Sequence, residues 1–362
     1  MKHFRNLAVS LSLGAFAFTA APAAADNFYQ GKRLTVLINF AVGGPTDIEG
    51  RLFAKHIGKH LGGNPNIIVQ NMDGGGGATG TNFLGEVAPK DGTVFGYLTG
   101  TAFQYAMKPQ SQRVDYLDYN FIAYQPGTAI YFMRTDIKPG LKTATDVVKG
   151  QNIVSGGLGV DNAKDILLRL TLDMLGVKYG YVTSYKGSAG ARNAFQIGEV
   201  NFYSESPPSY RAVIQPQLVE KGEAIGVYYD PNYDGEKLTT TSQTAGLDIL
   251  PFHELYAKIY GKQPEGELWE IYKAIIAVNG AMQRLIVMPP GAPKEAIEAL
   301  RVGIGKLNTD KAYGEDALKT FGFVPEWTAD PSVAAKVRKN LVLPAKTHQF
   351  LQKYVENPPK NR

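Results

Sequence analysis

Three glycine-bearing turns contain the residues best suited to bind an anion. The first lies in residues 34–47, LTVLINFAVGGPTD, which read as an apolar strand, a turn and the start of a helix. β-Branched and large apolar residues favour the strand, and Gly43 and Gly44 allow the turn. Thr46 and Glu49 have the spacing of a capping box, which predicts a helix start near Thr46. Because the first N–H groups of a helix lack partners at its positive end, this turn predicts half of a site for a carboxylate or phosphate.

Two further turns repeat this arrangement. Residues 71–80, NMDGGGGATG, follow a predicted strand at 66–70, and residues 156–162, GGLGVDN, follow one at 151–155. In the latter turn Asp161 or Asn162 is the expected N-cap. Strands that alternate with helices predict an α/β fold with mostly parallel sheets, in which ligands bind beyond the carboxyl ends of strands. A second lobe therefore offers its own helix start to the anion.

Other chemistry has weaker support in the residues. The run 75–80 fits the G-x-G-x-x-G dinucleotide pattern, but the acidic residue expected about twenty positions later is missing. His56 and His60 are spaced i, i+4, which suits a metal, yet the glutamate of a zincin motif is absent. The chain has no cysteine and no Gly-x-Ser-x-Gly elbow, so thiol and acyl-transfer catalysis have little support. We therefore predict no catalytic residue, no metal site and no cofactor.

The N-terminus reads as a secretory signal peptide at residues 1–25. Lys2 and Arg5 precede an apolar stretch at 7–20, and Ala23-Ala24-Ala25 has the small-residue pattern of a cleavage site. A short membrane anchor is the competing interpretation. The formal net charge of +5 falls by two when Lys2 and Arg5 are removed, and this modest balance suits small anions but not nucleic acid.

The remaining chain is too long for one ordinary core and predicts two lobes. We assign residues 26–125 and 245–362 to lobe I and residues 126–244 to lobe II. The chain then crosses between the lobes twice and forms a hinge.

Several ordered segments resemble one family, the Bug-type periplasmic solute-binding receptors of tripartite tricarboxylate transporters. The opening, LTVLINFAVGGPTDIEGRLFAKHIGKHLG, is similar to the strand, glycine turn and Thr-Asp helix start of that family. IIVQNMDGGGGATGTNFL, KDGTVFGYLTGT, YKGSAGARNAFQIGEVNFYSES and MPPGAPKEAIEALR resemble its later segments in the same order. The similarity extends over most of the chain after the signal peptide.

The resemblance implies two α/β lobes, joined by crossing strands, that close on a small carboxylate such as a di- or tricarboxylate or an aromatic acid. It implies a periplasmic, monomeric receptor that delivers its ligand to integral-membrane permease subunits, with no metal. Carried over to this chain, the ligand-binding residues of the first lobe are Val42, Gly43, Gly44, Pro45, Thr46, Asp47, Asn71, Thr79 and Thr101. Those of the second lobe are Gly157, Gly159, Asp161, Asn162, Tyr185 and Glu205.

The sequence departs from the family pattern in places. Its second-lobe turn is poor in Ser and Thr, Asn201 and Glu205 replace frequent aspartates, and residues 252–283 are longer than usual. Asp47 would repel an anion, so we expect it to accept a hydrogen bond that shapes the turn. Lys186 is either a solvated lysine or a counter-charge for the ligand. Two alternatives to a binding protein remain, a secreted α/β enzyme acting on an acid and a two-lobed sensor domain.

Overall fold

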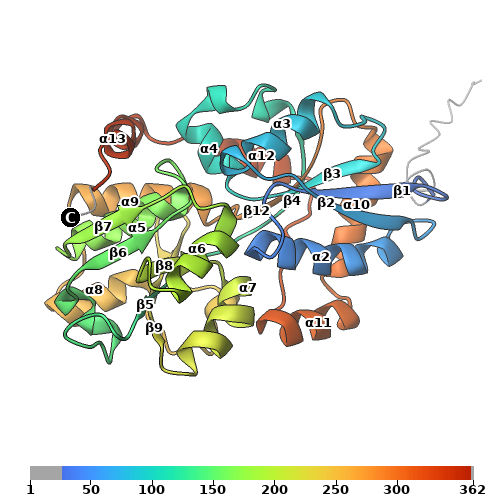
Figure 1. Cartoon of the computed structure of the whole chain (residues 1–362). Helices are drawn as coiled ribbons and strands as arrows, with labels where there is room; N and C mark the ends of the chain where they lie inside the picture. The colour runs from blue at the N-terminus through green and yellow to red at the C-terminus, as the bar shows by residue number, and fades with distance from the viewer. Residues whose placement is uncertain (1–26, 360–362) are drawn as a thin grey trace, which may run out of the picture.

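Two five-stranded sheets, each flanked by helices, make up the protein (Figure 1). The computed structural model describes residues 27–359, so the predicted signal peptide lies outside the described residues. The two-lobed α/β fold expected from the sequence is confirmed. Within residues 27–359, no helix combines the length and the apolar character that crossing a membrane requires.

The first sheet has the strand order β2-β1-β3-β12-β4. Its strands are β1 (Arg33–Ile38), β2 (Asn66–Asn71), β3 (Val94–Leu98), β4 (Asn120–Gln125) and β12 (Arg284–Met288). β1 pairs in parallel with β2 and β3, with Val36 opposite Val69 and Phe95, whereas β12 is antiparallel to β3 and β4. Figure 1 shows β1 and β3 crossing the lobe on the right of the view.

The second sheet has the order β7-β6-β8-β5-β9. Its strands are β5 (Ile130–Arg134), β6 (Ile153–Gly156), β7 (Tyr179–Val182), β8 (Phe202–Glu205) and β9 (Ala224–Tyr229). β6 is parallel to β7 and β8, and β5 is antiparallel to β8 and β9. Both sheets are therefore mixed. In each, the strand that enters from the other lobe, β12 or β5, runs against its neighbours, which the prediction of mostly parallel sheets did not specify.

Helices cover both faces of the first sheet, and a two-stranded ribbon extends from the second. The helices of the first lobe are α2 (Pro45–Ile57), α3 (Ala78–Glu86), α4 (Thr101–Met107), α10 (Lys294–Leu307), α11 (Lys311–Phe321) and α12 (Val333–Asn340). The ribbon is β10 (Asn232–Tyr233) with β11 (Leu238–Thr239). Pro45 occupies the first position of α2, where its fixed φ and missing N–H are tolerated. The predicted capping box is wrong, because Gly44 is the N-cap and no side chain caps the helix.

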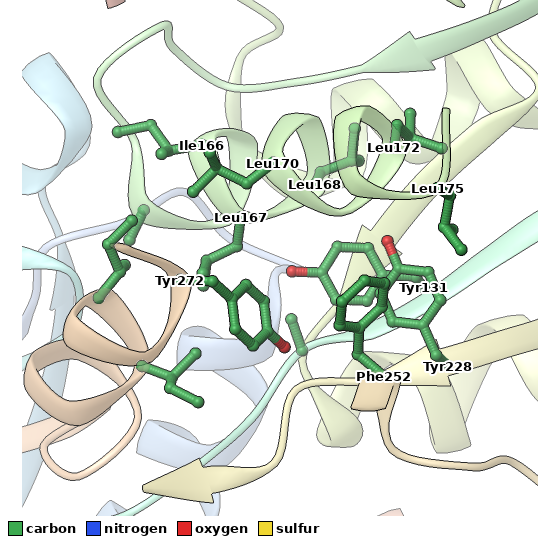
Figure 2. Packing of buried hydrophobic residues seen from close by; sticks show 14 of the residues in the cluster. Tyr131, Ile166, Leu167, Leu168, Leu170, Leu172, Leu175, Tyr228, Phe252 and Tyr272 are labelled. Carbon is green, nitrogen blue, oxygen red and sulfur yellow. The ribbon is translucent and has the colours of Figure 1, made fainter. Parts of the chain in front are cut away.

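The second lobe is built around α5, whose apolar face packs on aromatic side chains (Figure 2). Its helices are α5 (Ala163–Met174), α6 (Gly187–Gln196), α7 (Pro207–Ser209) with its π-helical continuation Tyr210–Val219, α8 (Phe252–Tyr260), α9 (Glu267–Asn279) and α13 (Ala345–Glu356). In one buried cluster Leu167 and Leu170 of α5 meet Tyr228, Phe252 and Tyr272. This cluster joins β9, α8 and α9 into one core.

The packing of the last helices differs from the predicted lobe assignment. The boundary at residue 245 assigned α8, α9 and α13 to lobe I, yet Phe252, Tyr272 and Leu351 share the buried cluster of α5. Arg169 of α5 donates from Nη2 to the carbonyl of Tyr354 at 2.9 Å, and Figure 1 shows α13 beside α9. That cluster also contains Phe103 and Met107 of α4, so these helices pack where the two lobes meet, and the lobe boundaries stay a prediction.

Candidate ligand-binding site

A cavity of about 390 Å³ lies between the two lobes at the carboxyl ends of their strands. Residues from the first turns of four helices line it, namely 44–46 at α2, 100 and 103 at α4, 162–164 at α5 and 187–189 at α6. Helix N-termini carry unpaired N–H groups and a partial positive charge. Because both lobes contribute such ends to one partly open space, the cavity suits a small anion.

A buried carboxylate fixes the first glycine turn. Gly43 has φ +80°, and its N–H donates to Oδ2 of Asp47 at 2.9 Å. Oδ1 of Asp47 accepts from Nε of Arg51 at 2.8 Å and from Nδ2 of Asn71 at 2.9 Å. Asn71 also donates to the carbonyl of Phe40 at 2.9 Å. Asp47 therefore shapes the turn, as expected, and its hydrogen bonds reduce its repulsion of an anion.

In the second lobe a buried carboxylate also fixes the glycine turn, and the sequence did not single out the residue that carries it. Oδ2 of Asp165, in the first turn of α5, accepts from the N–H of Gly159 at 2.9 Å and from the hydroxyl of Tyr181 at 2.5 Å. Burial raises the pKa of Asp165, and these two hydrogen bonds oppose that shift. Asn162 is the N-cap, as predicted, because its Oδ1 accepts from the N–H of Lys164 at 3.0 Å.

Seven of the fifteen predicted ligand-binding residues line the cavity. They are Val42, Gly44, Pro45, Thr46, Gly159, Asp161 and Asn162. They come from two segments, 42–46 and 159–162, which are distant in the sequence and which the structure brings to one cavity. Their contact with a ligand stays a prediction.

The other eight predicted residues lie outside the lining. They are Gly43, Asp47, Asn71, Thr79, Thr101, Gly157, Tyr185 and Glu205. Thr101 is buried with its hydroxyl 2.7 Å from that of Tyr116, and Tyr185 donates its hydroxyl to Glu199 at 2.7 Å. The Oε1 atom of Glu205 accepts from Arg192 at 3.0 Å. Side chains held by such neighbours support the walls of the cavity rather than face into it.

A buried ion pair forms part of the wall and was missed by sequence reasoning. Arg284 of β12 lines the cavity with only 1% of its surface exposed. Its Nε donates to Oε2 of Glu49 at 2.5 Å, and its Nη1 donates to Oγ1 of Thr99 at 3.0 Å. Burial raises the pKa of Glu49, and the charge of Arg284 and the amide of Gln125 oppose the shift. Glu49 and Arg284 lie 235 positions apart, so no local pattern links them.

Two contacts join the lobes beside the cavity. Nη2 of Arg192 on α6 donates to the carbonyl of Gly43 at 3.3 Å. Nζ of Lys108, directly after α4, lies 3.0 Å from Oδ2 of Asp161. These contacts connect the two glycine turns, or the residues beside them, across the cleft. The lobes therefore stand close together in this structure.

The histidines considered for a metal have other neighbours. Nε2 of His56 lies 2.8 Å from a carboxylate oxygen of Asp316, and Nε2 of His60 lies 2.8 Å from one of Asp310. Both aspartates belong to or precede α11. The two histidines therefore help to fasten α11 to α2, away from the cavity.

Two lobes closed around a cavity at their strand ends define the class of two-lobed periplasmic-binding-protein folds. No family model matches the chain. It is 30% identical over 187 residues to a UPF0065 protein of Agrobacterium vitis, which covers 49% of this chain and 52% of that protein. The chain thus aligns with about half the length of this curated relative.

Solved structures extend the likeness over nearly the whole chain. The periplasmic binding protein BugD matches with a TM-score of 0.65 and 19% identity, covering 90% of this chain and 98% of BugD. MatC of Rhodopseudomonas palustris with bound malate matches with a TM-score of 0.62 and 19% identity, covering 89% and 98%. A second R. palustris protein, solved with adipate, matches with a TM-score of 0.64 and 17% identity, covering 90% and 98%. The resemblance to Bug-type binding proteins is confirmed, and the protein has their fold.

Proposed function

We propose that the protein is a periplasmic solute-binding protein that captures a small carboxylate between its lobes and delivers it to a tripartite-type permease. The observation that carries this proposal is the cavity between the lobes at which helix N-termini of both lobes meet. The structural neighbours with malate and adipate support the choice of carboxylate over phosphate. Because only a closed form lets both lobes touch the ligand, the ligand shifts the population toward closure.

A thermal-shift screen of the chain starting near Asp26 tests the proposal. Malate, adipate, citrate and benzoate represent the four-carbon, six-carbon, tricarboxylic and aromatic classes. A ligand that binds only the folded state raises the melting temperature, by an amount that grows with its concentration over Kd. We expect at least one acid to do so and calorimetry to give a one-to-one complex without turnover.

Two outcomes would redirect the proposal. Consumption of the acid during incubation would favour a secreted enzyme, and co-purification with a histidine kinase ectodomain would favour a sensor. The periplasmic location is tested separately. Fractionation of cells and mass spectrometry of the exported chain should find a mature N-terminus close to Asp26. A full-length chain retained in the membrane fraction would support the anchor instead.

A further inference from the structure

Charged side chains on the cavity wall differ in whether the protein neutralises them. Three of them line the cavity, Asp161, Lys164 and Arg284. Asp161 pairs with Lys108 across the lobes, and Arg284 pairs with the buried Glu49. Within residues 27–359, no carboxylate oxygen lies within 4.0 Å of Nζ of Lys164. Lys164 is thus the cation on this wall whose charge no ion pair matches in the described part of the chain.

Lys164 also has spare hydrogen-bonding capacity. It is the second residue of α5, and its ammonium donates to the carbonyl of Ser204 at 3.2 Å. The same ammonium lies 5.5 Å from the ring centre of Tyr203. An ammonium has three donors, so two remain for another acceptor. The side chain is only partly buried, so an acceptor in the cavity has access to it.

We infer that Lys164 is the cation that binds the ligand's carboxylate on the second-lobe side of the cavity, an inference that rests on the proposed function. Hydrogen bonds between ionised groups are about twice as strong as neutral ones, and a partly buried site weakens screening by salt. The sequence left Lys186, which also stands at a helix start, open as either a solvated lysine or a counter-charge for the ligand. Lys186 is exposed and lies outside the cavity lining.

The charges around Lys164 couple this contact to protons. Burial lowers the pKa of Lys164, the carboxylates of Glu205 and Asp165 oppose that shift, and Arg284 and Arg192 add to it. Oε1 of Glu205 accepts from Arg192 and Oδ2 of Asp165 holds the glycine turn, whereas Oε2 of Glu205 has no hydrogen-bond partner among the described residues. The charge of Lys164 also acts on the buried carboxyl of Asp230 and lowers its pKa.

A bound carboxylate adds a negative charge beside the ammonium and raises the pKa of Lys164 toward its ordinary value. At a pH between the pKa of the free protein and that of the complex, the complex holds a proton that the free protein has lost. Affinity must therefore rise as pH falls, until Lys164 is protonated in both states. Proton uptake on binding is a signature that a purely structural lysine would not produce.

Calorimetric titration of the chain starting near Asp26 with malate, adipate, citrate and benzoate, from about pH 6 to pH 10, tests the inference. Lys164→Met should weaken binding about tenfold or more and remove the pH dependence. Lys164→Arg should keep most of the affinity without proton uptake, because a guanidinium stays charged. Lys186→Met is the matched control and should behave as the unmodified chain. In two buffers of different ionisation enthalpy, the apparent binding enthalpy should differ for the unmodified chain and agree for Lys164→Arg.

The two proposals fail in different ways. If the unmodified chain binds an acid, but Lys164→Met keeps both the affinity and its pH dependence, the role of Lys164 is overturned while the receptor function stands. If none of the four acids binds to the unmodified chain, both proposals are overturned. Circular dichroism and melting temperature of each variant separate loss of binding from loss of folding.

Discussion

The ionisation of Asp230 should make the stability of the protein depend on pH. Asp230 follows β9 beside the crossing between the lobes and is 4% exposed. Its carboxylate accepts from the hydroxyl of Tyr131 at 2.9 Å and from that of Tyr272 at 2.6 Å, and its carbonyl accepts from Oγ1 of Thr128 at 2.6 Å. Burial raises the pKa of Asp230 from 3.8 to about 7, although both tyrosine hydrogen bonds oppose the shift.

The sign of the effect follows from this raised pKa. Between 3.8 and about 7 the folded protein binds a proton at Asp230 that the unfolded chain does not. The free energy of unfolding therefore rises as pH falls through this interval. The contribution is complete below 3.8 and is lost as pH rises through about 7. Between about pH 8 and pH 5, this contribution to the free energy of unfolding builds up over about two pH units. It therefore amounts to about 3 kcal/mol at most.

Urea unfolding of Asp230→Asn between about pH 5 and pH 8 measures this contribution. Asparagine preserves the shape but cannot ionise, so the variant should lose about 3 kcal/mol of pH dependence. Trp269 is a local reporter, because its ring stacks on Tyr272 with centroids 5.2 Å apart. Trp327→Phe removes the other tryptophan of the chain and leaves this signal alone.

Comparing how the free energy of unfolding changes with pH in each variant separates Asp230 from other titrating groups. Exposed Asp248→Asn serves as the matched control and should follow the unmodified chain at every pH. If Asp230→Asn and the unmodified chain show parallel stability profiles from about pH 5 to pH 8, Asp230 does not change protonation in the folded state over that range. The reasoning from burial would then be refuted.

Two further substitutions test the first glycine turn and the buried ion pair in the cavity wall. Gly43→Val places a β-branched residue at φ +80°, so we expect at least about tenfold weaker ligand binding and a loss of about 1–3 kcal/mol in stability. The control is Gly44→Ala, whose backbone φ of −84° suits any residue, and calorimetry should find its stability unchanged. Normal ligand affinity in Gly43→Val would exclude Gly43 from shaping the site. Arg284→Met should cost about 3–5 kcal/mol in urea unfolding, because it leaves the buried Glu49 without its cationic partner. The double variant Glu49→Leu/Arg284→Met should recover most of that loss, and equal instability of the single and double variants would contradict the pairing argument.

Local sequence patterns predicted much of the backbone. The strands expected at 66–70 and 151–155 became β2 and β6, and the helix expected to start near Thr46 became α2, which begins at Pro45. Each of these signals is contained in one short window. β4, by contrast, was not predicted, because its sequence, NFIAYQ, has no regular alternation of apolar and polar residues. The helices in residues 252–279 were not assigned, although their apolar residues form much of the second core.

The positions of side chains were harder to predict than those of the turns. Sequence reasoning placed Glu205 in the ligand site because the resemblance implied an acidic residue there. Its partner Arg192, which satisfies one of its oxygens, lies on α6, whereas Glu205 ends the strand β8. Likewise Thr101 starts a helix at the cavity, yet its hydroxyl meets Tyr116 in the core. A motif marks where a residue sits along the backbone, whereas its neighbours in the fold decide which way its side chain points.

The two lysines at helix starts make the same point about function. Lys164 and Lys186 both flank glycine-bearing turns after a strand, so their sequence contexts are alike. Lys164 extends from the first turn of α5 to the carbonyl of Ser204 in β8, which keeps its charge at the cavity. Lys186 is the N-cap of α6, and its side chain is exposed. Backbone N–H groups make the site attractive to any small anion, so discrimination between anions must depend on side chains such as Lys164 whose placement is set by tertiary contacts.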